Sequence, residues 1–200
     1  EKRFETSKYD SAAPKGHRGV TLLKNGQDIL TEISDHQALI ASLYTSQWFL
    51  PFKEDVSRWD EKMNNLAHII INLTALQRQW IYLEPVFARN ALPSEKMRFK
   101  RVDESFCTFS ARIAVDPLVV SLLDIQQLRD SSYLQRLIAQ LDICQRALSD
   151  FLQDKRNVFP RFFFLGDDDL LELLGQASDP EVLQAHLKKL FGGVHGVRFD

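Results

Sequence analysis

The sequence predicts an elongated all-α protein, and three observations support this fold class. Apolar residues recur at spacings of three and four along most of the chain, which places them on one face of a helix. Runs with the alternating pattern of β-strands are nearly absent. One helical stripe is also too long for a compact globule of this chain length.

The longest predicted helix runs from Lys53 to Glu84. Its apolar stripe consists of Val56, Trp59, Met63, Leu66, Ile70, Leu73, Leu76, Trp80, Leu83 and Phe87. At 1.5 Å per residue this helix spans roughly 48 Å, whereas a compact chain of this size has a diameter of about 40 Å. Pro85 lacks a backbone N–H and crowds the preceding turn, so we expect the helix to kink or restart there.

The segments before the long helix are shorter. Residues 1–18 predict an irregular lead-in with one short strand near Phe4. Residues 20–33 predict an amphipathic helix, although an Asn-Gly pair weakens it. Asp35 predicts the N-cap of a second short helix. The side chains that this second helix would turn inward are Leu39, Ile40, Leu43 and Tyr44.

Two substantial helices follow Leu92 and Pro93. The first carries an apolar face of Met97, Phe99, Val102, Phe106, Phe109 and Ile113. Asp116-Pro117 then predicts an N-cap with proline at the first helical position, which opens a short apolar segment over residues 118–123. The second long helix has the stripe Leu134, Leu137, Leu141, Cys144, Leu148 and Phe151. It is expected to end just before Phe159 and Pro160.

Two compact helices are predicted near the end of the sequence. The first should be capped by Asp167 and end at Gly175, because glycine is the residue that most often follows a helix. The second should open at Asp179-Pro180 and end at Gly192-Gly193. No internal repeat is visible, so residues 19–200 are expected to form one helical unit behind the lead-in.

Composition excludes several functional classes. The chain has 25 basic and 27 acidic residues and a formal charge of -2, without the basic excess typical of nucleic-acid-binding proteins. Cys107 and Cys144 are too few and too isolated for a disulfide framework. No apolar run reaches the roughly 18 to 20 residues of a membrane span. The chain starts without Met or a signal-peptide pattern, so we expect a cytosolic fragment of a larger protein.

The residues that could carry catalysis or bind a metal do not form a recognisable pattern. Asp167, Asp168 and Asp169 fit the first turn of a helix, where acidic side chains complement the exposed N–H groups, better than they fit a metal site. The five histidines are scattered, and none has a second histidine one helical turn away. Phosphate-binding and hydrolase motifs are absent. We therefore predict no catalytic, cofactor-binding or metal-binding residue in this chain.

Two other clusters are interpreted as structural. Lys96, Arg98, Lys100 and Arg101 are flanked by acidic residues, which favours a solvated, ion-paired helix face. Residues 159–165 place four phenylalanines around an arginine next to a proline. A buried corner between helices is the preferred interpretation, and a docking surface is the alternative. The arginine is expected to stack on an aromatic ring or to bind carbonyl groups at a helix end.

Four segments resemble motifs of the dynein heavy-chain linker, in the same order. They are Gln77-Arg78-Gln79-Trp80-Ile81-Tyr82-Leu83-Glu84-Pro85-Val86-Phe87, then Leu92-Pro93 with Glu95, Phe99 and Val102-Asp103, then Lys155-Arg156 with residues 159–165 and 169–174, and finally Asp179-Pro180 with His186-Leu187-Lys188-Lys189-Leu190-Phe191. The resemblance covers roughly Val20 to Phe199. Residues 166–169 are similar to the cytoplasmic dyneins, and the segments around Arg98 and Gly175 to the intraflagellar-transport type.

The resemblance implies a mechanical role. Dynein linkers are curved stacks of helical bundles that arch over a ring of AAA+ modules, and they bend and straighten as the ring binds and hydrolyses ATP. It implies that ATP and Mg²⁺ bind in the ring of the parent chain and not in this segment, which would have no enzymatic activity alone. The implied partners are the AAA+ ring and, through the parent chain, intermediate chains, light chains and microtubules. The implied location is the cytoplasm and cytoskeleton, with the cilium for an intraflagellar-transport motor.

The same resemblance and the helix breaks together select candidate site residues. The candidate hinge consists of Pro85, Leu92, Pro93, Phe159 and Pro160, with Ala91 beside it. The candidate structural or docking motif consists of Trp80, Tyr82, Glu84, Phe87, Arg161, Phe162 and Phe163. Two rival functions remain open. One is a static cytoskeletal scaffold or adaptor, and the other is a metal-dependent hydrolase that uses Asp167 to Asp169.

Overall fold

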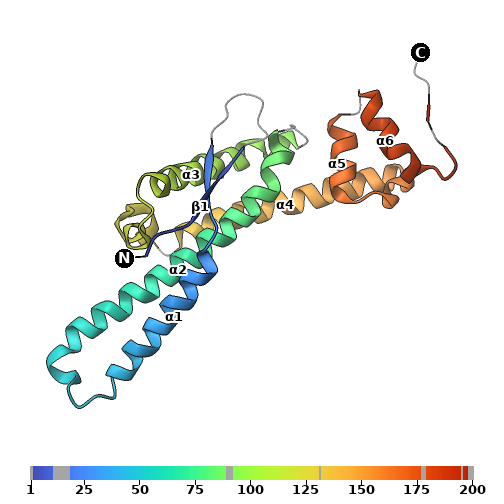
Figure 1. Cartoon of the computed structure of the whole chain (residues 1–200). Coiled ribbons are helices and arrows are strands. Elements are labelled where there is room, and N and C mark those ends of the chain that lie inside the picture. Colours follow the sequence, from blue (N-terminus) through green and yellow to red (C-terminus); the bar gives the residue numbers. More distant parts are fainter. Residues whose placement is uncertain are drawn as a thin grey trace.

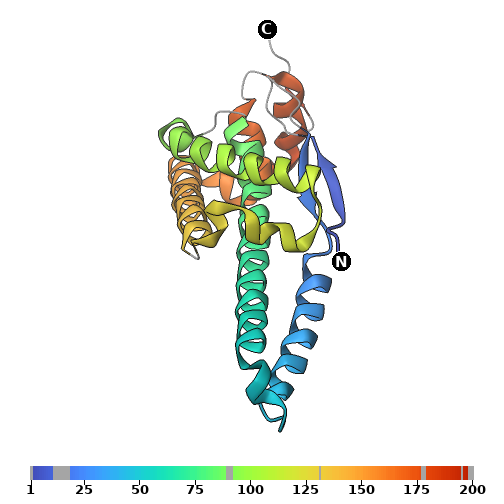
Figure 2. The same ribbon diagram turned by 90° about the vertical axis from the view of Figure 1, so that its left-hand side faces the viewer.

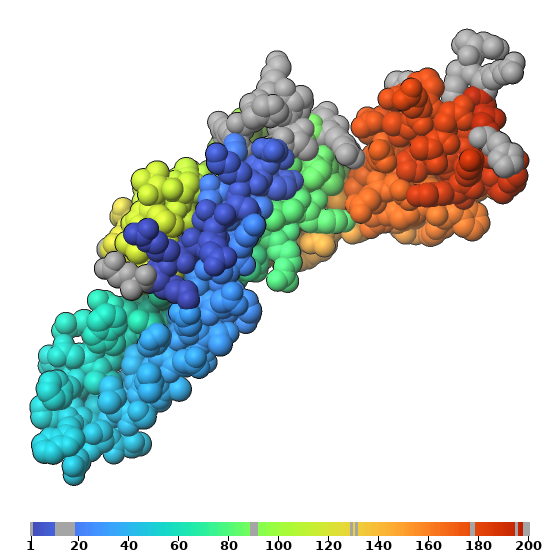
Figure 3. Space-filling model, viewed as in Figure 1, coloured from blue at the N-terminus to red at the C-terminus, as the bar shows by residue number. Residues whose placement is uncertain are grey.

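The fold was analysed in a computed structural model, which describes residues 2–10, 19–88, 92–130, 132–176, 179–194 and 196–197. Helices dominate, as predicted, and the molecule is elongated (Figures 1 and 3). A helical hairpin projects from one end of a central body, and a small helical unit lies at the other end. The predicted all-α, elongated architecture is confirmed, with one small β-hairpin added to it.

The projecting hairpin consists of α1 (Gly26–Leu43) and α2 (Phe49–Ala88), which pack side by side (Figures 1 and 2). Helix α2 has 40 residues, so at 1.5 Å per residue it is about 60 Å long. Its buried positions follow helical spacing and include Leu66, Ile70, Leu73, Leu76, Trp80 and Leu83. The N-terminal half of α2 packs along α1, and its C-terminal half enters the central body (Figure 1).

The central body surrounds the C-terminal half of α2. It contains α3 (Lys96–Val115), which follows the short 3₁₀ helix η1 (Pro93–Glu95), and the first part of α4 (Tyr133–Val158). The 3₁₀ helices η2 (Val119–Asp124) and η3 (Gln126–Arg129) connect these two helices. Phe109, Leu141 and Leu148 are among the fully buried side chains that fill the space between α2, α3 and α4.

Helix α4 leaves the body and carries the terminal unit (Figure 1). This unit consists of η4 (Pro160–Phe164), α5 (Asp167–Gly175) and α6 (Pro180–Leu190). As predicted, α4 ends just before Phe159 and Pro160, and Asp179 caps α6 by accepting a hydrogen bond from the Glu181 N–H. Helix α5 ends at Gly175 as expected, but its N-cap residue is Gly166, and Asp167 makes no capping hydrogen bond.

The predicted helix over residues 20–33 is wrong at its start. Residues Val20–Leu23 form strand β2, which pairs antiparallel with β1 (Thr6–Tyr9), so the strand expected near Phe4 lies slightly later in the chain. The side chain of Gln77 on α2 holds β2 in place. Its amide accepts a hydrogen bond from Leu23 N at 2.8 Å and donates to Leu23 O at 2.9 Å. Residues 11–18 of the predicted lead-in lie outside the described part of the chain.

The predicted second helix from Asp35 is also wrong, because α1 continues without a break from Gly26 to Leu43. The side chains expected to point inward, Leu39, Leu43 and Tyr44, are exposed. Met97 and Trp59 were likewise placed on buried stripes and are exposed. Leu39 and Leu43 lie in the last turns of α1, and Tyr44 follows the end of that helix, so the face predicted to be buried is exposed there.

Helix α2 continues through Pro85 to Ala88, so the helix does not end there. The proline costs one backbone hydrogen bond, but the preceding turns are packed inside the body and the helix extends for three more residues. The helical path is interrupted at Leu92 and Pro93, where η1 begins, and again at Phe159 and Pro160. Ala91 lies outside the described residues. No described helix is long and apolar enough to cross a membrane.

Candidate functional site

The first motif is built into the core rather than exposed. Trp80 is only 1% exposed, and its indole N–H donates to Asp103 at 2.9 Å. Its ring lies 4.7 Å from that of Phe106 and makes an edge contact with Tyr9. Trp80 therefore joins α2, α3 and β1 in a single packed cluster, which is a structural role.

Two neighbours of Trp80 in the motif are also buried. The carboxylate of Glu84 accepts a hydrogen bond from the Tyr9 hydroxyl at 3.3 Å, and burial together with this carboxylate raises the pKa of Tyr9. Phe87 stacks on Phe99 of α3 with 4.4 Å between ring centroids. Both contacts tie the end of α2 to elements that are distant in sequence.

Tyr82 differs from the rest of the motif because it is partly exposed and faces the terminal unit. Burial raises its pKa first, and the negative charges of Asp167 and Asp168 on α5 raise it further. The Tyr82 phenol therefore lies close enough to Asp167 and Asp168 for their charges to affect its pKa. These two residues belong to the acidic turn at the start of α5. This link between the body and the terminal unit was not predicted from the sequence, since the two segments are far apart in the chain.

The corner between α4 and α5 is stabilised by two arginines. Arg161 donates to the Leu190 carbonyl oxygen at 2.9 Å, and its guanidinium lies 4.6 Å from the ring of Phe191, so both interactions expected for this arginine are present. Arg156 donates to Leu165 O at 3.1 Å and to Asp167 at 2.7 Å. Phe162 packs edge-on against Phe159 inside this corner.

The corner is not fully buried, however. Phe163 is 56% exposed, and Phe164 next to it is also exposed. The structure therefore combines the two interpretations of this segment: one side of η4 is a packed corner, and the other leaves two phenyl rings at the surface.

The acidic turn at the start of α5 is engaged in ion pairs. Asp167 binds Arg156, and Asp169 binds Lys189 of α6 at 2.6 Å. The basic cluster of α3 is also paired, with Arg98 on Glu95 at 2.6 Å and a longer contact between Lys100 and Glu104. Two acidic residues of the turn and two basic residues of α3 are thus ion-paired, in agreement with the paired helix face predicted for the basic cluster.

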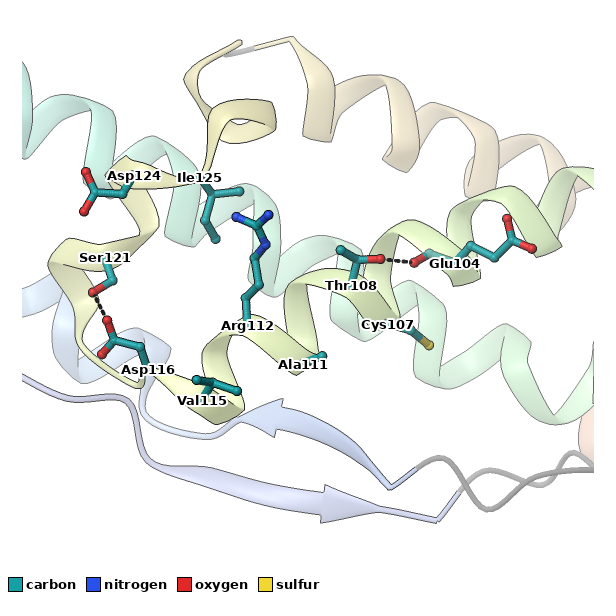
Figure 4. Close-up of a pocket in the computed structure, with 10 residues that line it drawn as sticks. All are labelled: Glu104, Cys107, Thr108, Ala111, Arg112, Val115, Asp116, Ser121, Asp124 and Ile125. Carbon is teal, nitrogen blue, oxygen red and sulfur yellow. Dashed lines mark hydrogen bonds between the residues drawn. The ribbon is translucent and has the colours of Figure 1, made fainter.

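A groove of about 930 Å³ lies beside α3 (Figure 4). Arg112 stands across it and points towards Ile125 in the loop between η2 and η3. Asp116 accepts hydrogen bonds from the Ser121 hydroxyl and the Leu118 N–H, and these bonds lower its pKa. No described histidine lines the groove.

The two cysteines should differ sharply in reactivity. Cys144 is fully buried in α4, and this burial raises its pKa from 9.0 to about 11. This increase in the pKa lowers the fraction of thiolate about a hundredfold relative to an ordinary thiol. Burial also prevents reagents from reaching the sulfur. Cys107 is half-buried at the groove. We expect iodoacetamide at about pH 8 to label Cys107 and leave Cys144 unmodified in the folded chain.

Mass spectrometry of the digested protein measures this difference directly. The same reaction in denaturant serves as the control, because both cysteines should then be labelled at similar rates. Equal labelling of the two thiols without denaturant would contradict the packing described for α4.

Several exposed apolar side chains lie towards the end of the α1–α2 hairpin. We call it the hairpin-tip surface, and it consists of Leu39, Leu43, Tyr44, Trp48, Leu50, Phe52 and Trp59. Trp48 is 69% exposed and Leu50 81%. Leu39, Phe52 and Trp59 also line a groove of about 640 Å³ between the two helices. Because exposed apolar patches are often interaction sites, the hairpin-tip surface is a candidate contact surface.

Comparison with known proteins gives consistent matches. The family model for the dynein heavy chain, N-terminal region 2, matches residues 1–200. The chain is 49% identical over 183 residues to cytoplasmic dynein 2 heavy chain 1 of Chlamydomonas reinhardtii, and 45% identical over 183 residues to that of Homo sapiens. It is 37% identical over 188 residues to dynein axonemal heavy chain 5 of Mus musculus. These alignments cover 91 to 92% of this chain but only 4% of each relative.

Proposed function

Because this chain belongs to the dynein heavy-chain family, we propose that it is a segment of the linker, the helical arm that bends and straightens over the AAA+ ring. The predicted resemblance to the dynein 2 heavy chains is confirmed by their higher identity, 45 to 49% against 37% for the axonemal relative. We propose accordingly that the parent motor acts in the cytoplasm and the cilium, in retrograde intraflagellar transport along microtubules.

The observation that best supports a mechanical role is the arrangement of the two long helices. Helices α2 and α4 pack against each other in the body and then leave it in different directions (Figure 1). The hairpin and the terminal unit are thereby held at opposite ends of one continuous core. Long helices with buried stripes resist bending, so force applied at one end is transmitted through the body to the other.

We propose that the hairpin-tip surface docks on the AAA+ ring of the same heavy chain. The chain spans only 4% of the length of its relatives, so most of the parent protein is available to cover this surface. In this proposal the segment itself holds no nucleotide, and ATP and Mg²⁺ act in the ring. Intermediate chains, light chains and the microtubule would be reached through other parts of the parent chain.

The interruptions of the helical path are the proposed hinges. Leu92 and Pro93 separate α2 from α3, and Phe159 and Pro160 separate α4 from the terminal unit. Pro85 is a weaker candidate, because helix α2 continues past it. One of the two rival functions, a static cytoskeletal scaffold, explains the long helices equally well. It does not explain the match to a family of motor heavy chains.

The proposal is tested by the double substitution Trp48→Ser and Phe52→Ser in the parent heavy chain. Both side chains are exposed, so the fold should be preserved. We expect microtubule gliding to slow several-fold while ATP hydrolysis continues, because hydrolysis and movement become uncoupled when a lever loses its contact with the motor. Val115→Ser, at an exposed apolar residue of α3, is the matched control. Gliding at the normal speed in the double variant would contradict this mechanical role.

A further inference from the structure

Helices α5 and α6 bring three potential metal ligands together in the terminal unit. Asp169 and Glu172 lie on α5, and His186 lies on α6, with one ligand atom from each within 4.8 Å of the others. His186 is only 5% exposed, although histidine is polar and its helix has a free outer face.

Glu172 fixes the protonation pattern of the imidazole. Its Oε2 lies 3.2 Å from Nε2 of His186, so in the neutral ring Nε2 carries the proton and donates it to this carboxylate. The other ring nitrogen, Nδ1, then has a lone pair. Nδ1 is buried and makes no hydrogen bond in the structure.

The lone pair of Nδ1 faces a second carboxylate. Oδ1 of Asp169 lies 3.8 Å from it, too far for a hydrogen bond. Lys189 binds the other oxygen, Oδ2, at 2.6 Å and thereby leaves Oδ1 open. The buried Nδ1 lone pair thus faces a carboxylate oxygen of a partly exposed side chain, an arrangement that a cation between the two atoms would stabilise.

We propose that His186 Nδ1 and Asp169 Oδ1 are ligands of a divalent transition-metal ion, for which Zn²⁺ is the best match, with Glu172 orienting the imidazole. Zinc binds histidine nitrogen and carboxylate oxygen at about 2.0–2.2 Å, and at a tetrahedral angle the two atoms would lie about 3.4 Å apart. The observed separation of 3.8 Å needs a shift of only a few tenths of an ångström. Water molecules would complete the coordination.

The position of Glu172 supports this assignment. A histidine that binds a metal through one nitrogen usually donates its other N–H to a carboxylate, which sets the tautomer and the ring orientation. Ca²⁺ and Mg²⁺ fit less well, because both prefer sites built from oxygen atoms alone. The ion would cross-link α5 to α6 and thereby stabilise the terminal unit. A proton on Nδ1 is the competing cation for the same position.

Calorimetric titration of the chain with ZnCl₂ separates these two cations. The protein carries Cys107→Ser in every variant, because a half-buried thiol can bind zinc by itself. After removal of metals with a chelator, the titration is run at about pH 7.5, where ordinary histidines are neutral. We expect saturable binding at a single site and a higher thermal unfolding midpoint with zinc.

The substitutions His186→Gln and Asp169→Asn should each abolish this binding. Glutamine can still donate a hydrogen bond to Glu172, so α6 remains attached, and circular dichroism monitors the fold. If the His186→Gln variant does not fold, the Asp169→Asn variant alone decides the test. Asp169 is partly exposed, so its substitution should preserve the fold. Glu172→Gln should weaken binding by about tenfold or more. His36→Gln, at an exposed histidine of α1, is the control and should bind zinc normally.

An absorption spectrum with Co²⁺ provides a second measurement. Ligation by histidine nitrogen in a site of low coordination number should give visible bands that disappear in His186→Gln and remain in His36→Gln. The proposal is overturned if the Cys107→Ser chain with both ligands intact binds neither metal, or if both ligand variants bind them as well as the control. Either result would leave a proton as the cation between His186 and Asp169.

Discussion

Trp80→Ala should unfold the central body at much lower denaturant concentration, with a loss of about 3–5 kcal/mol in the free energy of unfolding. The indole is fully enclosed and contacts Phe106 and Tyr9, so its removal leaves a large cavity between three elements. It also removes the N–H that donates to Asp103. Urea denaturation followed by circular dichroism measures the difference.

Trp59→Ala is the matched control, since both tryptophans lie on α2 and differ mainly in burial. Trp59 is 55% exposed, and we expect its replacement to change the free energy of unfolding by less than about 1 kcal/mol. Similar losses for the two substitutions would show that Trp80 is not the centre of the packed cluster. The motif around Trp80 would then need a role outside the core.

Gln145→Pro is expected to have the second large effect. Gln145 is an exposed residue in the middle of α4, the helix that connects the body to the terminal unit. Proline removes one backbone hydrogen bond and clashes with the preceding turn, at a cost of about 3 kcal/mol or more. It should also kink the helix between the two ends of the molecule. In the parent motor we expect microtubule gliding to slow strongly.

The comparison for this variant is Gln145→Ala, which keeps the helix and removes the same exposed side chain. It should preserve both stability and gliding speed, since alanine favours helix formation. If Gln145→Pro glides normally despite the loss of stability, α4 is not part of the path that transmits force.

Much of the fold could be predicted because its signals are local. The C-terminal end of α4 follows from the proline after Phe159, and the start of α6 follows from the Asp179 cap. Both signals act on the residues beside them. The burial of Phe99, Phe106 and Phe109 follows from helical spacing. These features depend on the chain within a few residues of each position.

The errors share a different cause, which is a partner distant in sequence. Val20–Leu23 has helical spacing but becomes a strand because β1 and the side chain of Gln77 supply its hydrogen bonds. The stripe through Leu39 and Leu43 shows correctly that these residues share a face. An apolar stripe does not show whether other parts of the same chain cover that face. In this structure Leu39 and Leu43 remain exposed.

The same limit applies to the candidate sites. The burial of Trp80 and the contacts of Arg161 could be inferred from residue type and neighbouring sequence. The approach of Tyr82 to Asp167, and of His186 to Asp169, depends on how separate helices pack. Neither pair has a fixed spacing that a sequence pattern could reveal.

The most direct test of the proposed linker role is energy transfer within the intact parent motor. A donor dye at the exposed position of Lys188 on α6 and an acceptor on the AAA+ ring report the distance between this segment and the ring. We predict two transfer efficiencies that exchange as the ring binds and hydrolyses ATP. A single efficiency in every nucleotide state, in a motor that still hydrolyses ATP, would contradict the proposal that this segment swings.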